Sequence, residues 1–198
     1  MYTLRTIKNL TIRGILPPLL VMAGLAGINS SAQAACFGYP ESTAGCKVNG
    51  VDGKCVGKTA AGDIIVAGAS FSGCTNPPTS DLDSGTCVIR GLGGPDRITP
   101  SSNSSGNMMI VCGGGGDDLI LGSSDNDVML GEAGSDIIIG EGGTNLIYGG
   151  SENDTLLTGG GGFSSSFNFN YGGTGTSDVC QKGRSGINYP AECEVTLP

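Results

Sequence analysis

Acidic and amide side chains recur at a fixed interval in the middle of this chain. The side chains that share one place in a nine-residue spacing are Asp118, Asp127, Asp136, Asn145 and Asp154. Carboxylate and amide oxygens are the ligands that Ca²⁺ takes in proteins. Residues 113–157 also hold nine acidic residues, and no Lys or Arg occurs between Arg97 and Lys182. Two interpretations follow, a solvated acidic surface or a row of metal ligands.

Cysteine is the second residue type that could do chemistry. All eight cysteines lie beyond residue 34, at positions 36, 46, 55, 74, 87, 112, 180 and 193. An even number of cysteines in an exported chain favours disulfides. Zinc is the competing interpretation, but the chain has neither a CxxC pair nor a histidine. Eight cysteines allow about a hundred connectivities, and neighbours in sequence predict Cys180 with Cys193, Cys74 with Cys87, and Cys36 with Cys46.

The elements that position these side chains follow from the same spacing. Five units follow one another from residue 113 to 157, and they read GGGGDDLIL, GSSDNDVML, GEAGSDIII, GEGGTNLIY and GGSENDTLL. Glycine permits left-handed backbone angles, so the first six places of each unit predict a turn. The last three places are apolar or β-branched and predict a short strand. We expect the eighth place to point inward, and it is occupied by Ile120, Met129, Ile138, Ile147 and Leu156.

This spacing resembles the repeats-in-toxin (RTX, hemolysin-type) nonapeptide GGxGxDxUx, in which U is a large apolar residue and the turns bind calcium. The resemblance implies an all-β fold, a parallel β-roll (β-solenoid) in which each nonapeptide forms half a coil. Residues 91–99 also fit the repeat, and residues 100–112 form a longer unit that contains an insertion. The segment around Asp63 reads as one further, worn unit.

Half-coils place every second repeat on the same edge of such a roll. One edge would stack Asp96, Asp118, Asp136 and Asp154, and the other would stack Met109, Asp127, Asn145 and Phe163. Neighbouring coils lie about 4.8 Å apart, and two carboxylates at that distance repel by about 3 to 4 kcal/mol at an effective dielectric near 20. A cation between coils would remove this repulsion.

The resemblance therefore implies several calcium ions held by this chain. The role of calcium ligand, which the family gives to the aspartate of the repeat, fits Asp118, Asp136 and Asp154 best. Backbone carbonyls of the turns would complete the coordination of each ion. Asp127 with Asn145 forms a weaker site, and a role for Asp96 depends on how the insertion packs. The alternative is a solenoid without metal, in which the aspartates only cap their turns.

Some units depart from the repeat at its glycines. Ser123, Glu132 and Glu141 stand at the second place, and Asp125 and Glu152 stand at the fourth. Because glycine is favoured where φ is positive, we expect backbone strain or weaker metal binding at these places.

The ends of the chain predict export and two terminal caps. Arg5, Lys8 and Arg13 precede an apolar run and the small-residue site Ala32-Gln33-Ala34, which is typical of a secretory signal over residues 1–34. Pro17-Pro18 interrupts the run, which is short for a membrane span. We divide the remainder into a cysteine-containing cap (35–80), a calcium-binding roll (81–166) and a C-terminal cap (167–198), because a solenoid needs its ends covered. The predicted location is secreted, extracellular or periplasmic.

Composition excludes several classes of function. Without the leader the chain has seven basic and eighteen acidic residues, which argues against a nucleic-acid partner. The absence of histidine removes histidine-based triads and the usual zinc-protease motif, so no catalysis is predicted. The predicted function is an exported calcium-binding roll whose fold calcium stabilises or switches. The alternatives are a calcium-dependent adhesion or protein-interaction module at the cell surface, working through its apolar sheet faces, and an accessory to a toxin or secreted enzyme.

Overall fold

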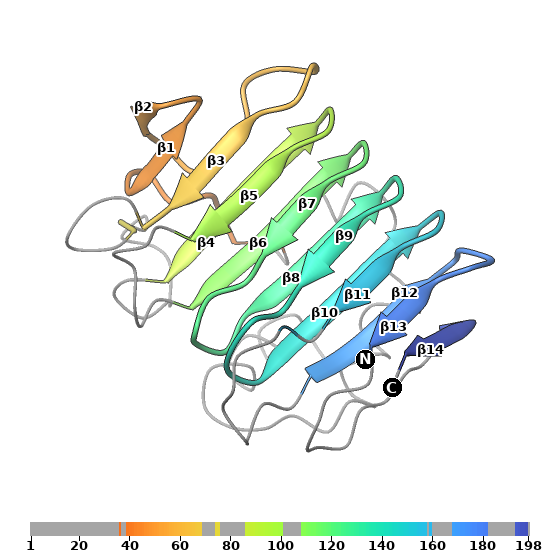
Figure 1. Cartoon of the computed structure of the whole chain (residues 1–198). Coiled ribbons are helices and arrows are strands. Elements are labelled where there is room, and N and C mark those ends of the chain that lie inside the picture. Colours follow the sequence, from red (N-terminus) through yellow and green to blue (C-terminus); the bar gives the residue numbers. More distant parts are fainter. Residues whose placement is uncertain are drawn as a thin grey trace, which may run out of the picture.

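The computed structural model describes residues 36, 39–68, 74–75, 86–100, 108–157, 159, 168–181 and 193–197, and all structural statements below concern these residues. The predicted signal segment, residues 1–34, lies outside them. Fourteen β-strands, β1 to β14, form the regular structure of this part of the chain. Figure 1 shows them stacked side by side along one direction.

One wall of the molecule is a nine-stranded sheet. Its strand order is β14-β13-β11-β9-β7-β5-β3-β1-β2. The strands are β1 (Cys46–Val48), β2 (Val51–Gly53), β3 (Ile64–Ala67), β5 (Arg97–Pro100), β7 (Leu119–Leu121), β9 (Ile137–Ile139), β11 (Thr155–Leu157), β13 (Val179–Gln181) and β14 (Val195–Leu197). All neighbours from β3 to β14 are parallel, and β1 pairs antiparallel with both β2 and β3.

The other wall is a five-stranded parallel sheet in the order β12-β10-β8-β6-β4. Its strands are β4 (Cys87–Gly93), β6 (Met109–Gly115), β8 (Val128–Ala133), β10 (Asn145–Ser151) and β12 (Asn168–Gly173). From β4 to β13 the chain alternates between the two walls, so each coil adds one strand to each. This is a parallel β-roll, and it confirms the predicted fold class.

The core lies between the two walls, and each repeat contributes one inward-pointing side chain to it. Each repeat sends its eighth residue inward, as predicted, and all of these side chains are fully buried: Ile120, Met129, Ile138, Ile147 and Leu156. Ile89 and Ile98 continue the same rows toward the N-terminal end. At the C-terminal end the rows continue with Asn170, which pairs in register with Ile147, and with Cys180, which pairs with Leu156.

The sheets extend beyond residues 81–166. β3 pairs with β5 and contains Ile65, which is fully buried in the core, so the worn unit near Asp63 is a true coil. At the other end, β12, β13 and β14 continue the ladders into residues 168–197. Both segments assigned from sequence as caps therefore contribute strands to the roll.

Four disulfides are present, and they correct one predicted pair. Cys74–Cys87 and Cys180–Cys193 form as predicted. Cys36 was expected to pair with Cys46, which is wrong: Cys36 pairs with Cys112, and Cys46 pairs with Cys55. The hairpin of β1 and β2 accounts for this, because it brings residue 46 close to residue 55.

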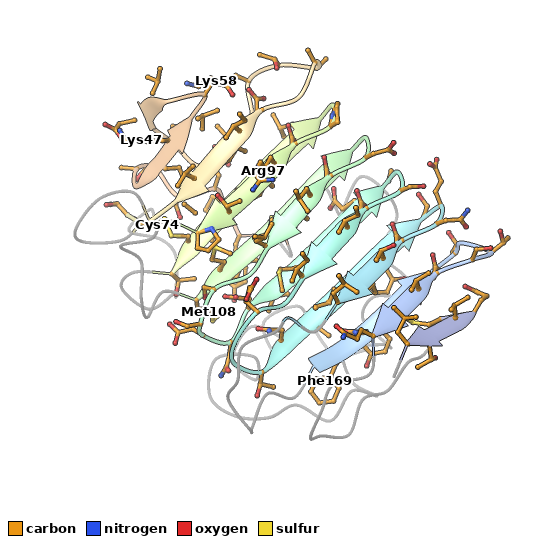
Figure 2. All side chains as sticks on the ribbon, viewed as in Figure 1. Lys47, Lys58, Cys74, Arg97, Met108 and Phe169 are labelled. Atoms are coloured by element: carbon orange, nitrogen blue, oxygen red, sulfur yellow. A yellow bond between two sulfur atoms is a disulfide. The ribbon has the colours of Figure 1, made fainter. Side chains whose placement is uncertain are left out.

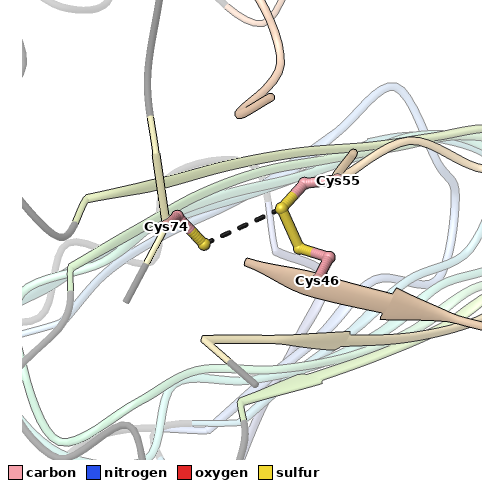
Figure 3. Close-up of side chains that lie close together, drawn as sticks. All are labelled: Cys46, Cys55 and Cys74. Carbon is pink, nitrogen blue, oxygen red and sulfur yellow. Dashed lines mark hydrogen bonds between the residues drawn. A yellow bond between two sulfur atoms is a disulfide. The ribbon is translucent and has the colours of Figure 1, made fainter. Parts of the chain in front are cut away.

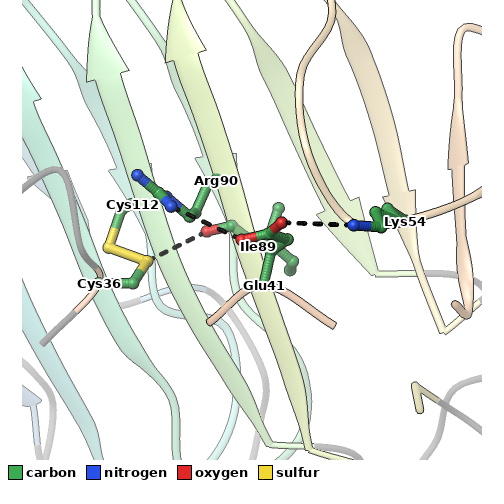
Figure 4. Close-up of polar contacts among 6 residues, drawn as sticks. All are labelled: Cys36, Glu41, Lys54, Ile89, Arg90 and Cys112. Atoms are coloured by element: carbon green, nitrogen blue, oxygen red, sulfur yellow. Dashed lines mark hydrogen bonds and ion pairs between the residues drawn. A yellow bond between two sulfur atoms is a disulfide. The ribbon is translucent and has the colours of Figure 1, made fainter. Parts of the chain in front are cut away.

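The Cys36–Cys112 bond fastens the N-terminal segment across the outer face of the five-stranded sheet. Tyr39 packs there in a cluster that also contains Val88, Ile110 and Leu130. Glu41 extends the contact by ion pairs with Arg90 (3.6 Å) and Lys54 (3.9 Å), and Figure 4 shows this set of contacts around the disulfide. The apolar outer face of this wall is therefore partly covered by the chain itself.

Candidate metal-binding ladder

A ladder of side-chain to backbone hydrogen bonds runs along one edge of the roll. The Oδ1 atom of each aspartate accepts the backbone N–H of the aspartate one coil earlier. The contacts are Asp96 N to Asp118 Oδ1 (2.7 Å), Asp118 N to Asp136 Oδ1 (2.8 Å) and Asp136 N to Asp154 Oδ1 (2.8 Å). The predicted order of this edge is therefore correct, including the step of twenty-two residues across the insertion.

The second oxygen of each of these carboxylates has no partner. The Oδ2 atoms of Asp96, Asp118, Asp136 and Asp154 are buried and accept no hydrogen bond, and the four residues are at most 3% exposed. A buried charged oxygen without a partner is costly. This row of oxygens therefore calls for protons or for cations.

The first residue of each turn is a glycine, and its missing side chain leaves room for the unpartnered Oδ2 atom. A Cβ built on Gly113, Gly131 or Gly149 would collide with the Oδ2 atom of Asp118, Asp136 or Asp154 respectively. The same Cβ positions also lie too close to a carbonyl oxygen of the next coil, which is Gly149 O for Gly131 (2.6 Å). A carboxylate oxygen and a carbonyl oxygen thus converge in each turn, and both are ligand types that Ca²⁺ accepts.

Burial sets the electrostatics of the ladder. It raises the pKa of Asp96 to about 6, of Asp118 and Asp154 to about 7, and of Asp136 to about 8. The backbone N–H bonds lower these pKa values and the neighbouring carboxylates raise them, but desolvation is the largest cause. Without a cation these carboxyls are therefore partly protonated near neutral pH, Asp136 most and Asp96 least, and a cation would displace those protons.

Positive φ angles recur at the second and fourth places of the turns on this edge. They are found at Leu92 and Gly94, Gly114 and Gly116, Glu132 and Gly134, and Gly150 and Glu152. The strain expected from lost glycines therefore occurs at Glu132 (φ 82°) and Glu152 (φ 77°), and also at Glu141 (φ 57°) on the opposite edge. Ser123 and Asp125 have no positive φ, so the backbone strain expected for that turn is not found.

The opposite edge is built differently. Asp127 Oδ1 accepts the Met109 N–H (2.7 Å), and its Oδ2 accepts the Ser123 N–H (2.5 Å). Asn145 Oδ1 accepts the Asp127 N–H (2.9 Å), while the Asn145 amide group donates to Gly140 O (2.8 Å) and Gly142 O (2.9 Å). The predicted stack of Met109, Asp127 and Asn145 is present, but both polar side chains already have partners.

Phe163 was predicted to follow Asn145 on this second edge. It lies outside the described residues, and the position in register with Asn145 belongs to Asn168 of β12. The chain between β11 and β12 is longer than one repeat, so the spacing of two repeats does not hold there.

The first ladder also extends past its predicted ends. Asp63 N donates to Asp96 Oδ1 (2.6 Å), Asp154 N to Asp178 Oδ1 (2.8 Å), and Asp178 N to Glu194 Oε2 (2.7 Å). Asp178 is fully buried and its Oδ2 has no partner, as in the repeats. Its turn, GGTGTSD, resembles a degenerate final repeat and places the aspartate one residue later than the repeat does, so Asp178 was not among the predicted ligands.

Asp63 closes the N-terminal end of the ladder. Its Oδ2 accepts the N–H groups of Lys58 (2.6 Å) and Thr59 (2.8 Å), and its Oδ1 accepts the Asn49 side-chain amide. Burial raises the pKa of Asp63, but the combined hydrogen bonds bring it below its usual value. This rung is stable as an anion without a cation.

Fold and ladder together define a parallel β-roll with stacked aspartate turns. A family model for the RTX calcium-binding nonapeptide repeat matches residues 113–147 and 130–162. The chain therefore contains RTX repeats over about a quarter of its length, and this part is a calcium-binding β-roll. Searches of curated proteins and of solved structures returned no match. In the part of the chain that the structure describes, no helix is long and apolar enough to cross a membrane.

Proposed function

We propose that the chain is an exported calcium-binding protein whose roll is held together by ions along one edge. The observation that carries this proposal is the row of buried Oδ2 atoms without partners at Asp96, Asp118, Asp136, Asp154 and Asp178. In each of these turns a glycine lies beside the aspartate, and a Cβ atom at that glycine would collide with the carboxylate. Calcium would occupy the turns of this edge, with carbonyl oxygens of adjacent turns as further ligands.

The opposite edge receives no strong calcium site in this proposal. Asn145 donates its amide hydrogens to the two turn carbonyls that a cation would otherwise contact, and the Asp127 carboxylate is bonded through both oxygens. This edge is thereby stabilised by its own hydrogen bonds. The Asp127 and Asn145 pair, which the sequence predicted as a weaker site, is therefore not among the calcium sites that we propose.

Calcium would act as a folding switch on leaving the cell. Free calcium is scarce inside cells, and extracellular modules bind it with Kd values of about 10⁻⁴ to 10⁻³ M. Metal binding to a site that forms only in the folded chain adds its free energy to folding. The leader-like residues 1–34 and the four disulfides support export to an oxidising location. No catalytic step is assigned.

The test is calorimetric calcium titration of the chain from residue 35 onward, with Asp136→Asn and Asp117→Asn compared. Asparagine keeps an oxygen that can accept the Asp118 N–H, but it replaces the unpartnered Oδ2 of Asp136. Asp117 lies in the same row of turns, is exposed, and accepts the Ser135 N–H (2.9 Å), so its substitution removes the same charge. We expect Asp136→Asn to lower the number of bound ions and Asp117→Asn to leave it unchanged. Equal effects of the two substitutions would contradict a specific ladder site.

A second candidate function is calcium-dependent binding of another protein or of a cell-surface component. The outer face of the nine-stranded sheet favours it, because Ile64, Ile137, Val195 and Leu197 are 39 to 55% exposed there. Pull-down experiments with and without calcium would separate the two functions. A partner retained only by the calcium-loaded chain favours binding, and equal recovery in both conditions argues against it.

A further inference from the structure

Four of the eight cysteines lie together at the N-terminal end of the roll. Cys46 is bonded to Cys55, and Cys74 is bonded to Cys87. The Sγ atoms of Cys46, Cys55 and Cys74 lie within 4.8 Å of one another, and Cys55 Sγ is 3.7 Å from Cys74 Sγ, as Figure 3 shows. All four residues are at most 5% exposed. The sequence contains no CxxC pair, so only the fold brings these sulfurs into one cluster.

The size of the cluster suits a thiolate-bound metal. Zn–S bonds of about 2.3 Å in a tetrahedron place neighbouring sulfurs about 3.8 Å apart. The contact between Cys55 and Cys74 already has this length. The two disulfide bonds hold Cys46 with Cys55, and Cys74 with Cys87, closer than a metal would, so reduction has to separate the bonded sulfurs. Cys87 is bonded to Cys74 and lies outside this group of three sulfurs, so it would have to move after reduction to serve as the fourth ligand.

The basic residues of the described chain also lie at this end of the molecule, although Lys47 is paired with Asp52. Four thiolates around a divalent ion carry a net charge of about −2. Lys47, Lys58 and Arg97 lie on or beside β1, β3 and β5, as Figure 2 shows. No Lys or Arg occurs from residue 98 to residue 181. The positive charges of the described chain are thus gathered at the end that holds the sulfur cluster.

We propose that the reduced chain binds one tetrahedrally coordinated soft cation of the zinc class through Cys46, Cys55, Cys74 and Cys87. The disulfide-bonded and metal-bound states exclude each other. Each disulfide accepts two electrons and two protons from a dithiol reductant, which itself becomes a disulfide, and yields two thiols. The metal then binds the thiolates and releases their protons. The metal would close the N-terminal end of the roll before the disulfides form, independently of calcium at the aspartate ladder.

The test uses the full chain, reduced under anaerobic conditions with a phosphine and kept in excess calcium. Co²⁺ is the probe, because tetrahedral cobalt thiolates have charge-transfer and ligand-field absorption bands. We expect one Co²⁺ per chain with these bands, and their loss when Zn²⁺ is added. The oxidised chain should show no such bands. Absence of the bands from the reduced chain would overturn the proposal.

Matched variants locate the site. Cys180→Ser with Cys193→Ser removes one disulfide pair at the far end and should leave the cobalt bands unchanged. Cys74→Ser with Cys87→Ser removes the same number of thiols and should abolish the bands. Should that variant fail to fold in calcium by circular dichroism, Cys46→Ser alone leaves three ligands and should shift and weaken the bands. Bands that persist after the loss of Cys74 and Cys87, bands that are unchanged in Cys46→Ser, or bands that vanish in the far-end control would show that other cysteines bind the metal.

Discussion

At the scale of single residues, the turns use glycine for two separate physical reasons. The glycine that opens each turn of the ladder edge is needed for space, because a side chain there would meet the aspartate Oδ2. The second and fourth places have positive φ in addition to little space, as at Gly114 (φ 115°) and Gly134 (φ 123°). Loss of glycine should therefore have different consequences at different places in the same turn.

Substitution at the first place should disrupt both the fold and calcium binding. In Gly131→Ala the new methyl group occupies the space of Asp136 Oδ2 and approaches Gly149 O, so the turn and its ligand must move. We expect a loss of about 1 to 3 kcal/mol in the free energy of unfolding and weaker calcium binding, measured by denaturation and calorimetry. Gly115→Ala is the control, because a Cβ there meets nothing within 4 Å. A loss of similar size in both variants would argue against the predicted collision between the new methyl group and Asp136 Oδ2.

At the second place of a turn, replacing a non-glycine residue such as Glu132 by glycine should increase the stability of the fold. Glu132 has a φ of 82°, and its Oε1 is buried without a partner. Burial also raises the pKa of Glu132 to about 7, which Arg90 only partly offsets. Glu132→Gly relieves both costs, and we expect a gain of about 1 kcal/mol in the free energy of unfolding in calcium. A thermal melt that moves down instead would indicate that Glu132 makes a compensating contact.

At the scale of elements, the two edges of the roll are stabilised by different means. The edge with Asp118 and Asp136 leaves carboxylate oxygens without partners, whereas the edge with Asp127 and Asn145 satisfies them through its own turns. Asparagine at one position in the repeat is enough to change the character of that turn. Calcium should therefore control the first edge and not the second.

Asn145→Ala tests this difference. It removes the acceptor for the Asp127 N–H and the donors to Gly140 O and Gly142 O. Leaving such groups unsatisfied costs about 1 to 3 kcal/mol, and we expect this loss to be the same in calcium and in chelator. Asp136→Asn should instead lose stability mainly in calcium. A calcium-dependent loss for Asn145→Ala, measured by denaturation in both conditions, would place an ion on the second edge.

The repeat predicted the elements well because each unit combines a turn signal with an inward apolar residue. Strand positions, the buried eighth residues and the order of Asp96, Asp118 and Asp136 all follow from that one spacing. Prediction was poorer where the spacing breaks. Asp178 and Glu194 extend the ladder through turns that depart from the repeat, and the Cys36–Cys112 bond joins residues seventy-six apart. Such contacts depend on how whole coils stack, which local sequence does not specify.

At the scale of the whole molecule, the ladder has one closed end and one open end. Asp63 is fully hydrogen-bonded and needs no cation, and three of the four disulfides lie at that end of the roll. Toward the C-terminus each coil depends on a rung with an unpartnered oxygen, up to Asp178. The N-terminal coils therefore form a stable base, and the remaining coils depend on whatever neutralises the ladder.

Protons and calcium should compete to neutralise it, which gives the calcium-free chain an unusual dependence on pH. The pKa values of Asp118, Asp154 and Asp136 are raised to about 7, 7 and 8, above the unfolded value of 3.8. A group with a raised pKa stabilises the fold below its unfolded pKa, and this stabilisation is lost as the pH rises through its folded pKa. The melting temperature of the calcium-free chain should thus decrease as the pH rises from about 5 to about 8, by about 2 to 4 °C for each kcal/mol lost.

Saturating calcium replaces the protons and should restore stability most at about pH 8. Circular dichroism melts across this range provide the measurement, with Asp136→Asn expected to show a shallower slope. A calcium-free chain that becomes more stable toward pH 8 would mean that the buried oxygens are neutralised by something other than protons or cations.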